Sequence, residues 1–252
     1  NVRGGNYDEN LIYINDFEIF RPYLVSSGQQ EGLSFINPEL AKNVNFYTGG
    51  FQAKYGDKMS SVLDILYKKP TAFGGSVYIS LLEQGLHLEG ISKKGKLSYL
   101  VGLRNRSNKN LLQSQETTGS YIPSSSDVQG LITYKLNDKI QLELLGIYSV
   151  TKFSLFPESA QKTTSVFSPL FTANLGLDIL FEGQEKDAYK TNLIGLSIIH
   201  NLNKKLKLKW MLSRFENKEN ENFDIAGNYL FGDRDFDNSS STYGQIVNPL
   251  GA

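Results

Sequence analysis

The sequence contains no cysteine. This absence excludes disulfides, iron–sulfur clusters, thiolate zinc sites and a cysteine nucleophile. An excess of charge of either sign is also lacking, because 26 Lys and Arg residues balance 26 Asp and Glu residues. Proteins that bind nucleic acid generally carry a basic excess. Nucleic acid is therefore not an expected partner.

Long hydrophobic runs are missing as well. Although 40% of the residues are hydrophobic, no stretch approaches the roughly 20 apolar residues of a membrane-spanning helix. A membrane protein is still possible, because a membrane β-strand alternates polar and apolar residues and averages to near-neutral hydropathy. The 12% aromatic content and the 23 glycines suit a β protein with many turns. The chain starts at Asn1 without Met or an apolar signal region, so we expect its beginning to be processed or missing.

Motifs of catalysis and metal binding are scarce. His87 and His200 lie on separate predicted strands, and neither has a serine or carboxylate at a useful spacing. There is no nucleophile elbow, phosphate loop or HExxH. The segment 233–237 begins like a calcium-binding loop, but its sixth position is Asn238 rather than Gly and its twelfth is Gly244 rather than Glu. We expect a solvated loop there, no metal site, no cofactor and no enzymatic activity.

The composition changes near Lys68-Lys69-Pro70 and predicts a boundary at about residue 70. Before it, the apolar run 11–14, the turn Asn15-Asp16 and the alternating segment 17–20 predict a hairpin. Asn37-Pro38 is a good start for a single helical turn over 37–42. Strands are expected over 44–47 and 61–67. Residues 1–70 are thus predicted to form a small mixed α/β unit.

After the boundary, residues alternate with period two, which no helix would sustain. Leu206, Leu208 and Trp210 alternate with Lys207 and Lys209. The same pattern marks residues 97–104, where Leu100 is an apolar exception on the polar face, and residues 140–148. Weaker strands are expected over 128–136 and 192–202, and a first hairpin over 77–91 with its turn at Gln84-Gly85.

Short and long connections alternate along these strands. The short ones are 93–95, 137–139 and 203–205, and the long ones are about 107–127, 155–189 and 216–243. An antiparallel meander places alternate turns at opposite ends, so one end has tight turns and the other long loops. This asymmetry is typical of an outer-membrane β-barrel. A soluble β-sandwich with one polar face is the alternative.

In a membrane barrel the two faces of each strand are fixed by energy. A lysine facing lipid near the midplane costs roughly 2–4 kcal/mol. Lys207 and Lys209 are therefore expected to face the lumen, and Leu206, Leu208 and Trp210 the lipid. Tyr134 and Tyr148 lie near strand ends, where aromatic girdles occur.

The first 70 residues carry a resemblance. Val2-Arg3-Gly4-Gly5 followed by Asn10-Leu11-Ile12-Tyr13-Ile14-Asn15-Asp16 resembles an Arg-Gly turn and the apolar strand after it in the plugs of TonB-dependent receptors, although the usual glycine after Asp16 is absent. Asn43 to Ile65, with Gly-Gly-Phe-Gln-Ala-Lys-Tyr-Gly and Ser-Ser-Val-Leu-Asp, is similar to the closing plug segment of receptors of the Bacteroidetes type. The likeness covers about residues 1–105 directly.

This resemblance implies a mainly β fold: part of a small α/β plug over 1–70, then about seven strands of a transmembrane antiparallel β-barrel over 71–252. Because plugged barrels of this family have about 22 strands, we expect the chain to be incomplete. The implied location is the outer membrane of a Gram-negative bacterium. The implied partners are TonB, through a segment not in this chain, outer-membrane lipid and lipopolysaccharide, and a surface lipoprotein or a larger outer-membrane complex.

The implied activity is TonB-dependent import of a scarce nutrient, such as a siderophore, cobalamin, a glycan or a peptide. The alternative is a structural or scaffold subunit of an outer-membrane complex that uses the receptor fold. Aromatic residues in or beside the long loops are candidates for substrate contact, against self-packing of the loops as the other interpretation: Tyr121, Phe153, Phe156 and Phe167. Arg3 and Arg104 are candidates for charge networks between plug and wall. The residues of the plug motif with a structural or coupling role are Arg3, Gly4, Gly5, Gly49, Gly50, Tyr55, Gly56, Ser60, Ser61 and Asp64. Its five glycines are expected to supply positive φ angles in turns.

Overall fold

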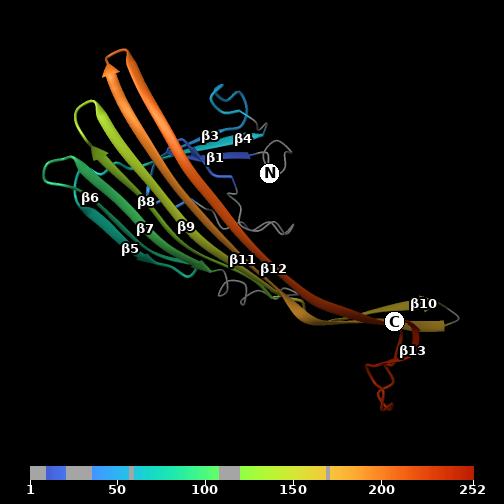
Figure 1. Ribbon diagram of the computed structural model, residues 1–252. Helices are drawn as coiled ribbons and strands as arrows, with labels where there is room; N and C mark the ends of the chain where they lie inside the picture. Colours follow the sequence, from blue (N-terminus) through green and yellow to red (C-terminus); the bar gives the residue numbers. More distant parts are fainter. Residues whose placement is uncertain (1–9, 21–35, 57–59, 108–119, 169–170) are drawn as a thin grey trace. The chain divides into compact units, whose positions relative to one another are not determined.

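The computed structural model describes residues 10–20, 36–56, 60–107, 120–168 and 171–252 (Figure 1). These residues form strands and turns in two sheets. The small sheet has the order β2-β1-β4-β3, and the wall sheet has the order β13-β12-β11-β9-β8-β7-β6-β5, with β10 paired to β11. Among the described residues, there is no helix with the length and apolar character needed to cross a membrane.

The small sheet confirms the strands expected before residue 70. It consists of β1 (Asn10–Ile14), β2 (Phe17–Glu18), β3 (Ala41–Tyr47) and β4 (Ser61–Tyr67). β1 pairs antiparallel with β2 and parallel with β4, while β3 pairs antiparallel with β4. The parallel pair places β1 and β4, the most buried strands, at the centre of the sheet.

The turn between β1 and β2 is tight. Asn15 and Asp16 have φ angles of 52° and 69°, which a type I′ hairpin turn requires and which Asn and Asp tolerate better than most residues. The Asn15 side-chain oxygen also accepts a hydrogen bond from the backbone N–H of Tyr67 at 2.8 Å. The predicted hairpin is confirmed, and its turn is fastened to the end of β4.

The helical turn expected over 37–42 is only partly present. Asn37 caps it, because its side-chain oxygen accepts the N–H of Glu39 at 3.1 Å, and the N–H of Leu40 donates to the Asn37 carbonyl at 3.2 Å. No helix follows, since Ala41 already begins β3 and pairs with Tyr67. Strand pairing therefore overrides the local helix signal, and the described part of this unit is a sheet with turns rather than α/β.

The wall sheet begins with β5 (Gly74–Ile79) and β6 (Glu83–Ile91). Their turn is at 80–82 rather than at Gln84-Gly85, because Ile79 pairs with Gln84 and the Ser80 hydroxyl caps the N–H of Glu83 at 3.0 Å. The remaining strands are β7 (Leu97–Ser107), β8 (Ser120–Lys135), β9 (Ile140–Phe156), β10 (Ala160–Ser168), β11 (Phe171–Asn203), β12 (Leu206–Arg234) and β13 (Ile246–Gly251).

The three short connections are confirmed as tight turns. Asn137 and Asn203 use the same device: each side-chain oxygen accepts two backbone N–H groups two and three residues later, at 2.8 to 2.9 Å. This local bonding is the reason asparagine is favoured in turns. Gly95, with a φ of 65°, supplies the left-handed position in the first turn.

The long connections were predicted wrongly over most of their length. Residues 160–168, 171–189 and 216–234 are strand, not loop, and β8 already starts at Ser120. Few side chains are buried in residues 160–168, 171–189 and 216–234, and a strand whose two faces are both exposed needs no apolar alternation. The period-two signal therefore disappears although the strand continues.

The chain divides into two units, which we describe separately. The first contains Asn1–Asn110, Pro123–Lys152 and Ala188–Asn220, and the second Leu111–Ile122, Phe153–Asp187 and Glu221–Ala252. In the second, β10 pairs with the start of β11 from Ala160↔Ile179 to Ser168↔Phe171. The Arg234 guanidinium there forms an ion pair with Asp178 and donates to the Gly244 carbonyl at 2.7 Å.

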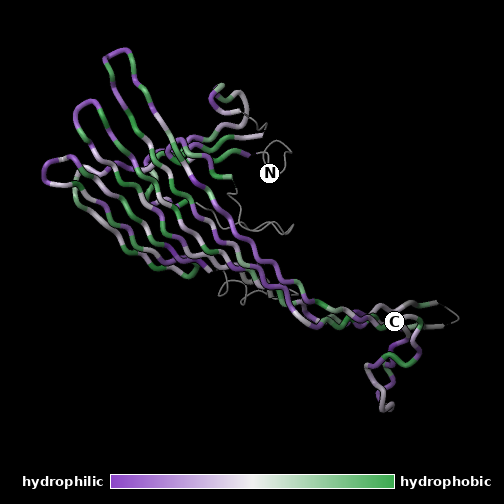
Figure 2. The backbone as a smooth tube through the Cα atoms, in the orientation of Figure 1, coloured by the Kyte–Doolittle hydropathy of each residue, from purple (hydrophilic) through white to green (hydrophobic). Residues whose placement is uncertain are grey.

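In the first unit the wall has an inner face, against the small sheet, and an outer face. Burial alternates along the strands between these two faces, and hydrophilic and hydrophobic residues are interspersed along the backbone of the wall (Figure 2). The outer face is an exposed apolar belt that includes Val77, Ile79, Leu88, Val101, Leu103, Val128, Ile132, Leu144, Tyr148, Ile194, Leu206, Leu208, Trp210 and Leu212. The predicted orientation of Leu206, Leu208 and Trp210 is confirmed.

The height of this belt can be estimated on β9. Its outward positions are apolar or glycine from Ile140 to Val150, and the next one is the exposed Lys152. The ten steps from Ile140 to Val150, at ~3.3 Å each, span about 33 Å along a strand. A tilt of about 40° reduces this to roughly 25 Å, the height of the apolar band of outer-membrane barrels.

Candidate functional site: the contact between the small sheet and the wall

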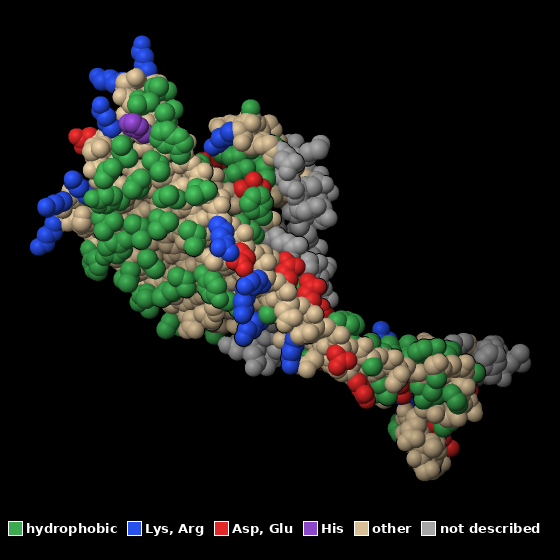
Figure 3. Space-filling view, viewed as in Figure 1, with side chains coloured by type: hydrophobic (Ala, Val, Ile, Leu, Met, Phe, Trp, Pro, Cys, Tyr) green, Lys and Arg blue, Asp and Glu red, His purple; other side chains and the backbone are tan. Residues whose placement is uncertain are grey.

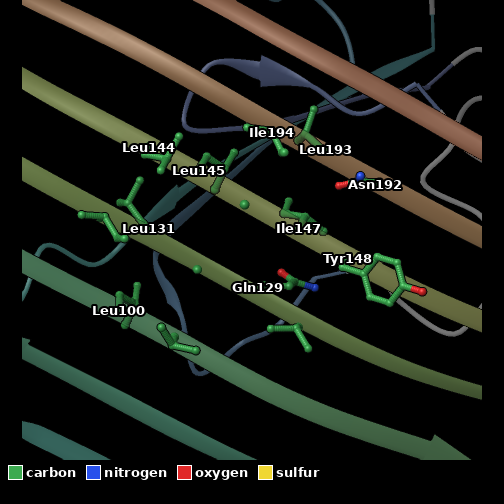
Figure 4. A pocket seen from close by; sticks show the side chains of 15 residues that line it. Leu100, Gln129, Leu131, Leu144, Leu145, Ile147, Tyr148, Asn192, Leu193 and Ile194 are labelled. Atoms are coloured by element: carbon green, nitrogen blue, oxygen red, sulfur yellow. The ribbon is translucent and has the colours of Figure 1, made fainter.

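The small sheet packs on an apolar patch of the inner wall face. Leu100, Leu131, Leu145, Ile147 and Leu193 are buried and contribute to one core, and the close-up shows them spread over neighbouring strands of the wall (Figure 4). Their partners from the small sheet and its flanking turns are Ile12, Ile14, Phe17, Ile19, Leu40, Ile65 and Tyr67. Leu100, the apolar exception of its strand, is thus explained by the sheet that covers it.

A polar chain crosses the same contact. The Tyr67 phenol donates a hydrogen bond to the Gln129 side-chain oxygen, and the Gln129 amide donates to Asp127 at 2.9 Å. Asp127 also accepts a hydrogen bond from Arg104 Nε at 2.9 Å. Arg104, on the wall, also donates a hydrogen bond to the backbone carbonyl of Ile36, which precedes β3 in the sequence, at 2.5 Å. The expected role of Arg104 in a network between the two parts is confirmed.

The side chains of this hydrogen-bonded series are buried. The side chains of Arg104 and Asp127 are each 2% exposed, and a second guanidinium, that of Arg106, lies 4.0 Å from the Asp127 carboxylate. Burial and the nearby Asp127 charge raise the pKa of Tyr67 well above its ordinary value of 10.0. Tyr67 therefore remains a hydrogen-bond donor at any physiological pH.

Two ion pairs flank the buried chain. Lys69, just after β4, contacts Glu143 on β9, and Lys209 on β12 contacts Asp16 in the β1–β2 turn. The contact of Lys209 confirms that it faces inward. Both lysine side chains are partly exposed, which limits the contribution of each pair to stability.

His87 has partners that the sequence did not predict. Its Nδ1 lies 3.4 Å from Ser76 Oγ, and its Nε2 lies 3.2 Å from Glu89. The expectation of an isolated histidine is wrong, because β5 and β6 pair Ser76 directly with His87. The Ser76 hydroxyl donates to Glu39 at 3.1 Å, so its proton points away from the histidine. These hydrogen bonds connect β5 and β6 to Glu39, in the turn before β3. The Ser76 hydroxyl lacks the geometry of an activated nucleophile.

The described residues of the segment that resembles a plug motif lie around β4. Tyr55 is buried, and its phenol donates to Asp64 at 2.8 Å. Lys54 lies 4.0 Å from the Asp64 carboxylate and 4.4 Å from the centre of the Tyr55 ring. The hydrogen bond to Tyr55 raises the pKa of Lys54. Ser60 is buried, and Ser61 ties β4 to Asn10 of β1 through their side chains at 2.5 Å.

The glycines of the motif differ in role. Gly49 and Gly50 have φ angles of 145° and 65°, so the turn after β3 requires them. Gly56 is not among the residues with positive φ, and a Cβ there would meet nothing within 4 Å. The expectation that Gly56 supplies a left-handed turn is therefore wrong. Arg3, Gly4 and Gly5 lie outside the described residues.

The aromatic candidates for substrate contact belong to strands of the second unit. Phe153 is buried at the end of β9, Phe156 is 38% exposed and Phe167 on β10 is 81% exposed. Tyr121 is on β8, and its side chain lies outside the described part. These positions are strand, not loop, because the extensions described above continue through them.

In the segment that begins like a calcium-binding loop, polar groups form hydrogen bonds with one another. Asp235 accepts hydrogen bonds from the N–H of Asp237 at 2.8 Å and from the Thr242 hydroxyl at 2.7 Å. Hydrogen bonds, that from Ser240 first among them, lower the pKa of Asp235. Among the described residues, no group of three His, Cys, Asp or Glu side chains could hold a metal ion.

Comparison with known proteins gives only distant likenesses. Neither the protein families nor the curated proteins contain a match to this sequence. Among solved structures, the chain is similar to a mutant of the ferric enterobactin receptor of Pseudomonas aeruginosa, with a TM-score of 0.48, 11% identity, and coverage of 91% of this chain and 47% of that one. For the siderophore receptor PirA of Acinetobacter baumannii, the TM-score is 0.47 and the identity 16%, with coverage of 92% of this chain and 41% of that one. For the ferripyoverdine receptor of the outer membrane of Pseudomonas aeruginosa, the TM-score is 0.38 and the identity 13%, with coverage of 83% of this chain and 36% of that one.

The chain therefore spans less than half the length of each of these proteins. With TM-scores below 0.5, the case for a function rests on the geometry of this chain. Sequence reasoning missed the main members of the contact, Tyr67, Asp127 and Gln129. The available signal was a run of inward polar positions, Ser125, Asp127 and Gln129, which crosses from the segment assigned to a loop into the strand expected over 128–136.

Proposed function

We propose that this chain is part of an outer-membrane transporter of the TonB-dependent type, with a plug up to about residue 70 and part of a transmembrane β-barrel after it. One observation carries the proposal. A sheet with an apolar outer belt roughly 25 Å high holds a second, small sheet against an apolar patch on its otherwise polar inner face. A soluble sandwich buries its apolar face, whereas here that face is the exposed one.

The contact between the two sheets suits a removable plug. Its polar part consists of hydrogen bonds and ion pairs. A typical hydrogen bond has a net value of only about 0.5–1.5 kcal/mol when both partners become hydrated on separation. The motif from Asn43 to Ile65 supports TonB as the partner that supplies the energy. The cargo we propose is a scarce nutrient, such as a siderophore, cobalamin, a glycan or a peptide, with Phe156 and Phe167 as exposed candidates for contact.

A disulfide lock tests whether the small sheet must move. A Cβ on Gly102 would lie 2.7 Å from the Asn37 side-chain nitrogen, so Asn37→Cys with Gly102→Cys places two thiols within reach of each other. The assay is uptake of ferric siderophores, cobalamin, oligosaccharides and peptides by cells that produce the full-length protein. We expect oxidation to abolish TonB-dependent uptake and reduction to restore it.

The controls separate locking from damage. Each single cysteine variant should transport normally. Ser98→Cys with Thr133→Cys joins two paired wall strands and should leave uptake intact when oxidised. Uptake that continues with the small sheet locked, or without TonB, would contradict the proposal. A protein that imports none of the substrates but co-purifies with stable partners would favour the scaffold alternative.

A further inference from the structure

The three short turns carry a concentration of positive charge. Seven exposed lysines lie in or next to them, and we call this group the basic rim: Lys93, Lys94, Lys96, Lys135, Lys139, Lys204 and Lys205. Asp138 is the single carboxylate in the same turns. Within the described part of the chain, none of these lysines forms an ion pair. In a chain with zero net charge, this charge is local and uncompensated.

The turns lie at one edge of the wall. The N–H of Lys135 donates to the Lys96 carbonyl at 2.7 Å, which joins the first turn to the second. The N–H of Asn201 donates to the Lys139 carbonyl at 2.8 Å, which joins the second to the third. The space-filling view shows Lys and Arg side chains at the tips of the turns, beside the hydrophobic surface of the strands (Figure 3). The basic rim is thus one continuous surface.

The apolar belt begins directly beside the basic rim. Leu97, Leu136, Leu202 and Leu206 are 39–49% exposed and lie within a few residues of the lysines. The opposite end of the belt also carries exposed lysines, Lys152 on β9 and Lys190 on β11, but they lie on strands and not in the short turns. A row of ammonium groups on the border of an apolar surface matches an anionic lipid, whose phosphate lies next to its acyl chains.

We propose that the basic rim binds the phosphate headgroups of anionic phospholipids, with the acyl chains against the outer face of the wall. This inference rests on the proposed membrane location. A lysine near an anionic surface raises the affinity by up to about fivefold, and salt screens the attraction over about 10 Å at 0.1 M. Specific lipids would then hold the short-turn end at a fixed depth in the membrane.

Trp210, the one tryptophan of the chain, is a reporter near the basic rim. It is 51% exposed on the outer face of β12 and lies beside His200. The experiment reconstitutes the full-length protein in phosphatidylcholine vesicles with increasing brominated phosphatidylglycerol, or with brominated phosphatidylcholine. The difference in fluorescence quenching between the parent protein and its Trp210→Phe variant gives the contribution of Trp210. We expect the anionic lipid to quench at a several-fold lower mole fraction, and high salt to reduce the difference.

Matched variants assign that preference to the basic rim. Lys96→Gln, Lys204→Gln and Lys205→Gln together should abolish it, whereas Lys152→Gln with Lys190→Gln should leave it unchanged. Equal quenching by both lipids in the parent protein, or equal losses in the two variants, would overturn the proposal. Soluble glycerol phosphate should not compete; competition would indicate a free phosphate site instead. Membrane insertion is scored separately by protease protection, so a protein that fails to insert contradicts the proposed function, and one that inserts without preference contradicts only the basic rim.

Discussion

The Tyr67 phenol, on the last residue of the small sheet, donates a hydrogen bond to the side chain of Gln129 on the wall. Both residues are buried, so water does not replace the bond when one partner is lost. Tyr67→Phe should lower the free energy of unfolding by about 1 kcal/mol. Urea unfolding of the full-length protein in detergent measures this, and Tyr148→Phe on the outer face should have no effect. A double-mutant cycle with Gln129→Ala that gives no coupling would contradict the predicted bond.

The raised pKa of Tyr67 predicts how stability depends on pH. The unfolded chain loses the phenol proton near pH 10.0, the ordinary value, but the folded protein keeps it to higher pH. The contribution is therefore complete below pH 10.0 and is lost as the pH rises further, with a slope of up to about 1.4 kcal/mol per pH unit. Tyr67→Phe should make this decline shallower in urea unfolding between pH 9 and 11. An identical decline in both proteins would contradict the prediction.

The sequence was sufficient to predict the alternating faces and the short turns. Leu206, Trp210 and Lys209 point as expected because period two leaves only two choices, and the inward choice for a lysine is much cheaper in a membrane. Leu100 shows the limit of this reasoning. Leu100 is buried in a core that it shares with Leu40 and Ile65 of another part of the chain, and no pattern within its own strand shows what covers a face.

The series of hydrogen bonds from Tyr67 through Gln129 and Asp127 to Arg104 could not be predicted for a related reason. Tyr67 and Gln129 are 62 residues apart in sequence, and the register that pairs Arg104 with Asp127 follows a long connection rather than a tight turn. Hydrogen bonds that depend on two separate sheets leave no local signal. The strand extensions were hidden differently, because wetting of both faces removed the hydropathy pattern on which the assignment depended.

Asp127 should be the most sensitive charged residue of the contact. Asp127→Asn keeps the shape of the side chain but leaves the Arg104 guanidinium, with its side chain 2% exposed, without its carboxylate. Removing one partner of a buried ion pair costs about 3–5 kcal/mol. The midpoint of urea unfolding measures the loss, and Asp138→Asn in an exposed turn is the control. Similar midpoints for the two variants would contradict the assigned role.

Leu100 and Val101 are neighbours in sequence on opposite faces of β7. Leu100 is 0% exposed beneath the small sheet, and Val101 is 36% exposed on the outer belt. Leu100→Ala should cost about 2–5 kcal/mol because it leaves a cavity in the core. Val101→Ala should cost below about 1 kcal/mol, because lipid or detergent fills the space. Unfolding of both variants under the same conditions measures the difference, and a reversed order would contradict the assignment of the faces.

Gly195 is a position where the small sheet lies very close to the wall. A Cβ at this position would lie 2.8 Å from three atoms of the Phe17 ring, and Phe17 is buried in the core with little room to shift. Gly195→Ala should therefore destabilise the protein by about 1–3 kcal/mol. Gly146→Ala is the matched control on the next strand of the wall, because a Cβ there meets nothing within 4 Å, and alanine is no worse than glycine within a strand. Limited proteolysis of the full-length protein follows release of the small sheet. Faster cleavage is expected only for Gly195→Ala, and equal cleavage of both variants would show that Phe17 does not press on the wall at this point.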